Sequence, residues 1–199
     1  MGIRSLVSWR SAALVSFAAA CLWAADTAGL LTVNLDPAKT GVSWELAGNM
    51  HTTHGTFKLK ESSIQIDLGK GTVSGYVAID ARSGESGNST RDQRMHREII
   101  ESAKYPEIRF TFEKLDGLLT REGDSKVKIT GLMELHGGKH QITVPAEVRL
   151  TSNQLSSTLR FEIPYVEWGL KDPSSFIFRV DKKVNIEVHA SGTLVNSGQ

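Results

Sequence analysis

From residue 30 onward, hydrophobic and polar residues alternate along most of the chain with a period of two. Residues 42–46, for example, read Val-Ser-Trp-Glu-Leu, which places the apolar side chains on one side of an extended segment. Such alternation predicts half-buried β-strands. Nine such runs, near residues 42–46, 57–59, 64–68, 73–79, 108–112, 127–135, 142–150, 155–163 and 180–190, indicate about eight strands.

Short turns such as Gly69-Lys70-Gly71 join these runs. About eight strands joined in this way, each apolar on one face, predict an all-β fold in which an antiparallel sheet forms a barrel or a sandwich. Gly75 and Gly131 lie in mid-strand on the apolar face, where a tight bend or a bulge commonly requires glycine. No linker or repeat divides the sequence, so we predict one β-barrel domain over residues 30–196.

One segment interrupts the alternation and predicts a short α-helix at about residues 90–103. Its apolar residues recur at helical rather than strand spacing. Thr90 and Gln93 have the spacing of a capping box at the helix start. Tyr105-Pro106 is expected to end the helix, because the residue before a proline is disfavoured in the α region.

The first residues have the pattern of a secretory signal peptide. Arg4 and Arg10 precede an apolar run from Ala12 to Ala25 that is too short to span a bilayer comfortably. We therefore expect residues 1–25 to be a signal peptide and the mature protein to be periplasmic or secreted. A retained membrane anchor and a lipoprotein signal with Cys21 lipidated are the alternatives. Cys21 is the only cysteine, so the mature domain has no internal disulfide and no cysteine-based metal site.

Charge and composition exclude some classes of function. Lys and Arg number 23 against 22 Asp and Glu, and the net charge is +1. This balance lacks the clustered basic composition of a nucleic-acid-binding protein, so we expect no nucleic-acid partner. With 40% hydrophobic residues, the chain is also not an intrinsically disordered one.

The alternation also indicates what the inside of the barrel contains. Nearly every inward position is apolar, and Lys182, near the start of a strand, is the exception. An enzyme needs a nucleophile, a base or an electrostatic stabiliser in its pocket, so we expect no catalytic residue and no cofactor. Barrels of about eight strands hold either packed side chains or one small ligand. A solid-cored interaction module and a hollow barrel that binds an apolar ligand therefore both remain open.

For a hollow barrel, the predicted ligand-binding residues are the large inward side chains and two arginines. Arg91 and Arg94 crowd the start of the predicted helix, against the preference of its dipole. A tolerated surface helix is the simple interpretation; the sharper one is that these arginines hold or screen a polar head group at the mouth. The other predicted residues are Trp44, Leu46, Phe57, Val77, Ile79, Phe110, Phe112, Met133, Phe161 and Trp168.

The histidines offer a competing chemistry. His51 and His54 lie before a strand, and His136 and His140 flank a turn. Histidines at such spacing can share a metal ion, so a secreted enzyme that depends on a metal or a small molecule is the alternative function. No cysteine supports them and no carboxylates are organised around them, so we expect exposed loop histidines and no metal site.

Several motifs, in order along the chain, resemble the YceI-like domain family. Gly87-Asn88 followed by Arg91-Asp92, and then Lys104-Tyr105-Pro106, is similar to the family's segment that leads through a short helix into a strand. Residues 131–144, GLMELHGGKHQITV, resemble its hairpin, and Gly55-Thr56-Phe57 resembles its early strand. The resemblance covers essentially the whole mature chain.

This resemblance implies an extended, lipocalin-like antiparallel barrel with an elongated apolar cavity. Family members are exported bacterial proteins, some of which bind polyisoprenoids or related long-chain amphiphiles. The resemblance therefore implies an isoprenoid or other long-chain lipid as partner, for sequestration or transport, with possible membrane proximity; the oligomeric state stays open, with a dimer possible. Arg94-Met95 replaces the family's His-Leu, which affects the expected head group more than the expected fold.

Overall fold

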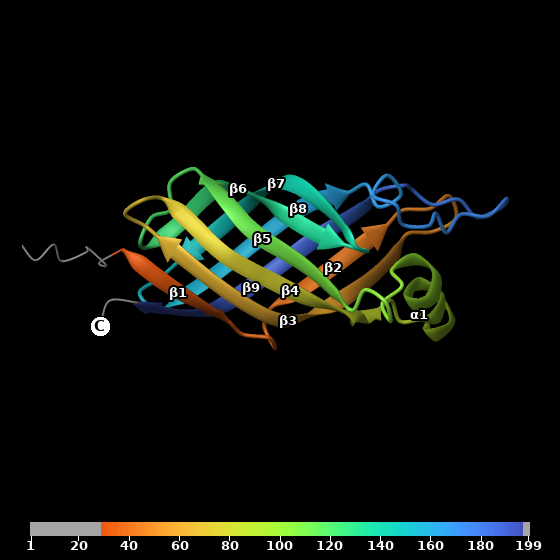
Figure 1. Ribbon diagram of the computed structural model, residues 1–199, viewed down its shortest axis with the longest axis horizontal. Helices are drawn as coiled ribbons and strands as arrows, with labels where there is room; N and C mark the ends of the chain where they lie inside the picture. Colours follow the sequence, from red (N-terminus) through yellow and green to blue (C-terminus); the bar gives the residue numbers. More distant parts are fainter. Residues whose placement is uncertain (1–28, 197–199) are drawn as a thin grey trace, which may run out of the picture.

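The computed structural model describes residues 29–196, so the predicted signal peptide and Cys21 lie outside the described residues. Nine strands and one short helical segment follow one another along the chain (Figure 1). The helical segment consists of α1 (Ser89–Arg94) and a π-helical turn, η1 (Met95–Ile99). The strands are β1 (Leu30–Leu35), β2 (Gly41–Leu46), β3 (Thr53–Asp67), β4 (Thr72–Glu85), β5 (Glu107–Asp116), β6 (Gly123–Leu135), β7 (Gly138–Leu150), β8 (Gln154–Ile163) and β9 (Val184–Asn196).

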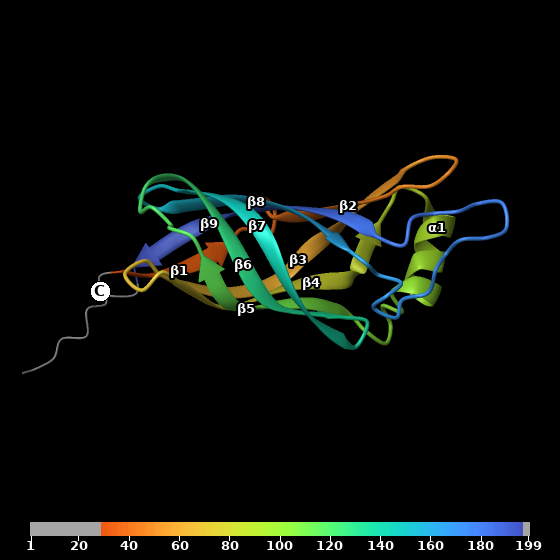
Figure 2. The same cartoon turned by 90° about the horizontal axis from the view of Figure 1, so that it is seen from above.

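The sheet closes into an eight-stranded barrel, because β1 and β2 lie one after the other between β3 and β9 and together fill the place of one strand. Both pair antiparallel with β3 and with β9: β1 with residues 64–67 and 192–196, and β2 with residues 53–58 and 185–189. All the other neighbouring strands are antiparallel as well. Full closure leaves the sheet without a free edge. The predicted antiparallel barrel with one short helix is confirmed (Figure 2).

The break between β1 and β2 is tied to the neighbouring strand. The backbone amide of Asp36 donates to the carbonyl of Ser191 at 2.8 Å. The Thr40 hydroxyl donates to the same carbonyl, at 3.1 Å, and accepts from the Ser191 amide, also at 3.1 Å. These bonds keep the two short strands in line across the interruption.

The two mid-strand glycines are sites of close approach. Gly75 adopts a φ of +102°, and a Cβ atom there would overlap the carbonyl oxygen of Ser63 on β3. At Gly131, a Cβ would overlap the ring of Phe110 and the backbone of Thr111 on β5. Both positions fit the prediction of a tight bend or a close backbone contact in mid-strand.

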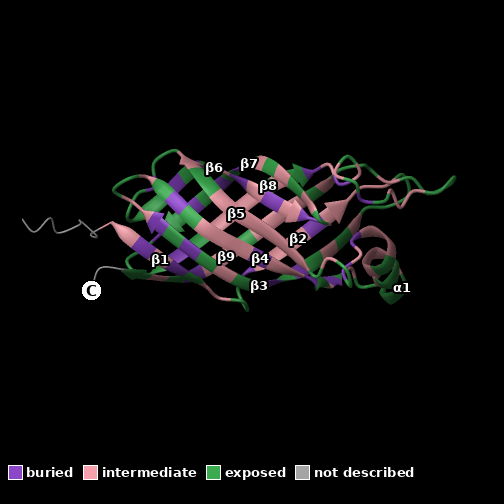
Figure 3. Ribbon diagram, viewed as in Figure 1, coloured by how far each residue is buried: buried purple, intermediate pink, exposed green. Residues whose placement is uncertain are grey.

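Buried and exposed residues alternate along the strands, as the period-two pattern predicts (Figure 3). On β7, for example, Val144, Ala146, Val148 and Leu150 are buried, and the residues between them are exposed. The largest fully buried side chains are Leu150 and Val33, each 1% exposed, and they lie toward the end of the barrel where β1 begins and β9 ends. The opposite end carries the helix (Figure 1).

The helix differs from its prediction in its cap and its end. Asn88 is the N-cap, and its side-chain oxygen accepts from the Arg91 amide at 3.0 Å, in place of the predicted capping box. The helix ends at Ile99 rather than at residue 103, because Glu101 takes a left-handed backbone conformation, with φ +50°. Neither helical element in the described residues is long and apolar enough to cross a membrane.

Candidate ligand-binding cavity

A cavity of about 210 Å³ lies inside the barrel. All nine strands contribute to its wall, because each turns alternate residues inward. Thr40 and Ser157 are the only polar residues in the lining, and none of the lining residues is charged. Such a wall offers van der Waals contact and burial of apolar surface. It offers almost no polar contact, because the Thr40 hydroxyl is already bonded to Ser191.

The cavity brings together seven of the predicted ligand-binding residues and leaves five outside. Other lining residues, such as Ile142, Leu159 and Val188, were not predicted, although the period-two pattern places them inward. Thr40 has no such signal, because it lies in the turn between two strands. The seven predicted residues in the lining are Phe57, Val77, Ile79, Phe110, Phe112, Met133 and Phe161.

Trp44 and Leu46 lie beyond the cavity lining, toward the helix. Trp44 is 8% exposed and packs in one buried cluster with Phe57, Ala81 and Ile100, and Leu46 borders that cluster. The indole lies over Gly55, where a Cβ atom would overlap it. Its Nε1 is buried, with no hydrogen-bond acceptor among the described residues. These side chains therefore pack the barrel against the helix.

Trp168 belongs to a segment that closes the same end of the barrel. Its ring stacks on that of His140, with the centroids 4.1 Å apart and the planes parallel. Nearby, Tyr165 and Leu170 are buried against the cluster that contains Met133. The Tyr165 hydroxyl donates to the Asp181 carbonyl at 2.8 Å, and burial raises the pKa of Tyr165 to about 12.

Arg91 and Arg94 lie near the helix start, where the sequence placed them. The guanidinium of Arg91 donates from Nε to the Ser86 hydroxyl at 2.7 Å and from Nη2 to the Ser86 carbonyl at 2.8 Å. Arg91 thus braces the turn before the helix. Arg94 is more exposed; it pairs with Glu98 at 3.5 Å and reaches the Pro173 carbonyl at 3.4 Å. Their role toward a head group stays a prediction.

Glu98 links the helical segment to the chain that follows β8. Its carboxylate accepts from Arg97 at 2.6 Å and from the Lys171 ammonium at 3.0 Å. These two hydrogen bonds, that of Arg97 first, lower the pKa of Glu98 to about 2. A depressed pKa means that the folded state favours the ionised carboxylate.

This arrangement predicts an acid-sensitive contact between the helix and residue 171. The stabilisation by Glu98 is complete above its unfolded pKa near 4.5 and is lost as the pH falls from there toward about 2. We expect the protection factors of amides around Lys171, taken relative to the intrinsic exchange rate at each pH, to fall over this range, and those of a Glu98→Gln variant to be low already at neutral pH. Glu167→Gln, at an exposed residue of the same connecting segment, is the control and should behave as the wild type. Identical pH profiles for Glu98→Gln and the wild type would contradict the assignment.

The four histidines that could have shared a metal ion are not gathered into a site. His54 pairs with Glu45 at 3.5 Å, and His51 is exposed. The prediction of exposed loop histidines is wrong for the other two: His136 is only 17% exposed and contacts Glu101 at 2.5 Å, and His140 lies within β7 and stacks on Trp168. Over residues 29–196, no three His, Cys, Asp or Glu side chains are placed to hold one metal ion together. These histidines therefore do not form the set of ligands on which the alternative, a metal-dependent enzyme, was based.

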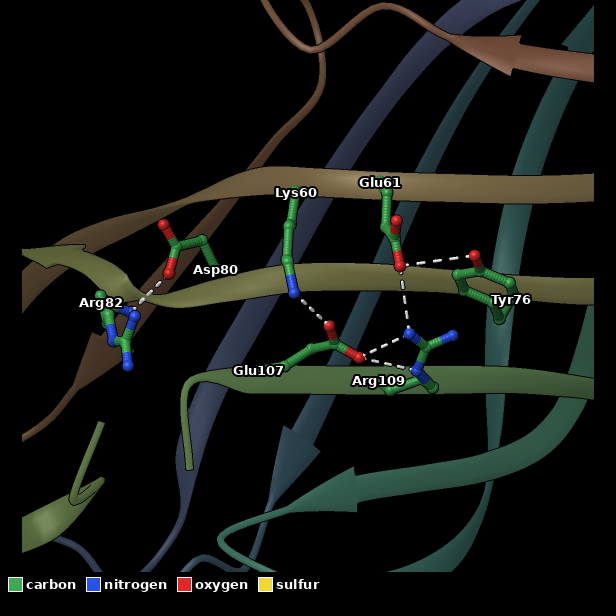
Figure 4. Close-up of polar contacts among 7 residues, drawn as sticks. All are labelled: Lys60, Glu61, Tyr76, Asp80, Arg82, Glu107 and Arg109. Carbon is green, nitrogen blue, oxygen red and sulfur yellow. Dashed lines mark hydrogen bonds and ion pairs between the residues drawn. The ribbon is translucent and has the colours of Figure 1, made fainter. Parts of the chain in front are cut away.

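A network of ion pairs covers the outer face of β3, β4 and β5 (Figure 4). Glu107 accepts from Lys60 and from Arg109, each at 2.7 Å, and Arg109 also pairs with Glu61 at 3.2 Å. The guanidinium lies 3.9 Å from the centre of the Tyr76 ring. The hydrogen bond from Lys60 is the main reason that the pKa of Glu107 is lowered. Two cations balance two anions here, so we interpret the network as a brace across three strands.

Comparison with known proteins agrees with this geometry. Residues 33–191 match the YceI-like domain. The chain belongs to the YceI-like domain family. Among YceI-like relatives, a UPF0312 protein of Vibrio parahaemolyticus is 27% identical over 172 residues, which cover 81% of this chain and 84% of the relative. A UPF0312 protein of Vibrio campbellii is 29% identical over 124 residues, covering 61% of this chain and 60% of the relative.

Solved structures share the YceI-like barrel. BcnA of Burkholderia cenocepacia superposes with a TM-score of 0.68 at 19% identity, over 79% of this chain and 99% of BcnA. A polyisoprenoid binding domain from Saccharophagus degradans, implicated in plant cell wall breakdown, gives a TM-score of 0.65 at 18% identity, over 83% of this chain and 99% of that domain. At such identities the likeness establishes the fold. The resemblance found in the sequence is thus confirmed.

Proposed function

We propose that this protein is an exported lipid-binding protein whose barrel holds an isoprenoid-like or other long-chain amphiphile, for sequestration or transport. The observation that carries the proposal is the cavity wall, in which every lining residue except Thr40 and Ser157 is apolar. An apolar chain gains about 0.8 kcal/mol for each methylene group that it buries. A polar or charged ligand would lose hydrogen bonds to water and find little in return, because the Thr40 hydroxyl is already bonded to Ser191 and only the Ser157 hydroxyl is left in the lining.

The size of the cavity adds a condition to this proposal. Its volume of about 210 Å³ is below the range of roughly 300–1,000 Å³ that is usual for small-molecule pockets. Phe110 and Phe112 both line it and contact each other edge to face, with centroids 5.3 Å apart. A long chain would therefore enter as these rings and neighbouring aliphatic side chains change rotamer.

Two further observations support the proposal. The solved barrel from Saccharophagus degradans is described as a polyisoprenoid binding domain, and it covers 83% of this chain in the superposition. Export rests on the signal-peptide pattern of residues 1–25. A binding role also fits a cavity whose lining has no charged side chain to act as acid or base.

Native mass spectrometry of the protein purified from a bacterial host tests the proposal. We expect a bound species that raises the mass of the intact protein and that lipid extraction recovers as a long-chain compound. Added prenyl alcohol should load any empty fraction. If no long-chain species co-purifies and no prenyl alcohol is taken up, the cavity is not a lipid site.

A further inference from the structure

Large exposed hydrophobic side chains gather at the end of the barrel that carries the helix. Among the described residues, six large hydrophobic side chains are strongly exposed, and four of them lie in two neighbouring loops. These loops, residues 47–52 and 171–183, are called the loop pair below. They project beyond the strands at the helix end (Figures 1 and 2). The four side chains are Met50 (65% exposed), Phe176 (94%), Ile177 (67%) and Phe178 (54%).

Backbone hydrogen bonds hold the loop pair in this form. The Asn49 amide donates to the Arg179 carbonyl at 2.9 Å, and the Arg179 amide donates back to the Asn49 side-chain oxygen at 3.0 Å. The Asn49 side-chain amide also donates to the Ile177 carbonyl at 3.0 Å. Within the second loop, the Ser175 amide donates to the Phe178 carbonyl at 2.7 Å. The hydrophobic side chains are therefore presented to solvent by an ordered backbone.

The loop pair is also basic. It contains four basic residues, Lys171, Arg179, Lys182 and Lys183, and two acidic ones, Asp172 and Asp181, so its formal net charge is 4 − 2 = +2. Lys171 pairs with Glu98 at 3.0 Å and Lys183 with Glu162 at 3.4 Å, both outside the loop pair, so Arg179 and Lys182 are the basic residues placed to meet an anionic partner. Arg179 directly follows the exposed Phe178 and is itself exposed. Aromatic and aliphatic tips flanked by Lys and Arg suit the boundary between acyl chains and anionic head groups.

The form of the surface argues against a second copy of the chain as its partner. A stable protein interface buries about 800 Å² on each side and uses roughly 20–30 residues. Here the apolar residues are four side chains on the projecting loop pair. A few projecting side chains have too little area for such an interface, but they can insert into the soft boundary region of a bilayer.

We propose that the loop pair docks the protein on an anionic lipid surface, with Phe176, Ile177 and Phe178 inserted at the boundary and Arg179 and Lys182 near the head groups. This inference rests on the proposed function in one respect: the lipid surface would be the source or the destination of the lipid in the cavity. The same end carries the segment 164–170 that closes the barrel, so docking would place the closed end against the lipid.

Sedimentation with lipid vesicles tests the docking surface. The protein purified after export, without its signal peptide, should sediment with vesicles of phosphatidylcholine and phosphatidylglycerol, and less with phosphatidylcholine alone or at high salt. The double variant Phe176→Ser/Ile177→Ser should lower the partition coefficient about tenfold or more, because it removes most of the inserted apolar area. Leu118→Ser is the control, since this side chain is 77% exposed but lies between β5 and β6 at the opposite end; its binding should be unchanged.

Several results would overturn the docking proposal. Equal vesicle binding by the double variant and the wild type is one, and absence of binding by the wild type is another. Sedimentation equilibrium that shows a wild-type dimer and a monomeric double variant, with the same vesicle binding, would assign the surface to self-association. Uptake of prenyl alcohol from solution, without vesicles, reports on the cavity alone. Its absence in both the wild type and the double variant would count against the proposed function, whatever the vesicles show.

Discussion

A Ser157→Phe variant is expected to lose lipid uptake while it keeps the barrel fold. Ser157 on β8 lines the cavity beside Ala190 of β9, so both inward side chains at this register position are small. A phenyl ring there would project into a space of about 210 Å³ and take the room of the ligand. Overpacking costs about 1–3 kcal/mol in a filled core, and an existing cavity reduces that cost. We expect the loaded fraction in native mass spectrometry to fall about tenfold or more.

Ser156→Phe is the matched control for this variant. Ser156 is the preceding residue on the same strand, is exposed, and points outward because successive strand residues face opposite sides. This variant should load lipid as the wild type does, and circular dichroism should show an intact sheet in both variants. If Ser157→Phe is folded and loads normally, the ligand lies outside the barrel.

Gly75→Ala is expected to destabilise the barrel by about 3 kcal/mol or more. The added methyl group would overlap the Ser63 carbonyl oxygen, and a non-glycine residue is strained at a φ of +102°. Relief would require a shift between β3 and β4, which pair at Gly75 and Ile64. The change should be visible as a lower midpoint of urea-induced unfolding, with little change in the slope.

Gly41→Ala provides the comparison for this stability effect. A Cβ atom at Gly41 would have nothing within 4 Å, and its φ is not positive. Alanine there should change the free energy of unfolding by less than about 1 kcal/mol, because it mainly restricts the unfolded chain. If both variants unfold at the wild-type midpoint, Gly75 does not require its special backbone conformation.

The sequence predicted which residues face the inside of the barrel better than it predicted how far along the barrel each of them lies. Alternation is a local property, and it identifies which face of the strand carries Phe110, Phe112 and Met133. It does not tell how far along the barrel an inward residue lies. Trp44 faces inward in the pattern, but it belongs to the buried cluster that contains Ile100, at the end of the barrel where β2 ends and the helix lies.

Features that depend on backbone conformation or on contacts between loops were not predictable in the same way. The early end of the helix follows from the left-handed conformation of Glu101, a residue type with no strong preference for it. The capping role of Asn88 was within reach, since Asn is a favoured N-cap residue. The exposure of Phe176 depends on hydrogen bonds from Asn49, 127 positions earlier in the chain, and no local pattern reveals such a pairing.

β9 pairs with both β1 and β2, and this pairing sets the order in which the strands assemble. β9 joins β8 to β1 and β2, and its partners in β1 and β2 lie 140 or more positions earlier in the sequence. Contacts between such distant segments form late, because the entropy of closing a long loop opposes them. Before β9 docks, the sheet has two open edges and the cavity has no complete wall. Under the proposed function, the lipid can therefore be loaded only after the whole domain has been synthesised.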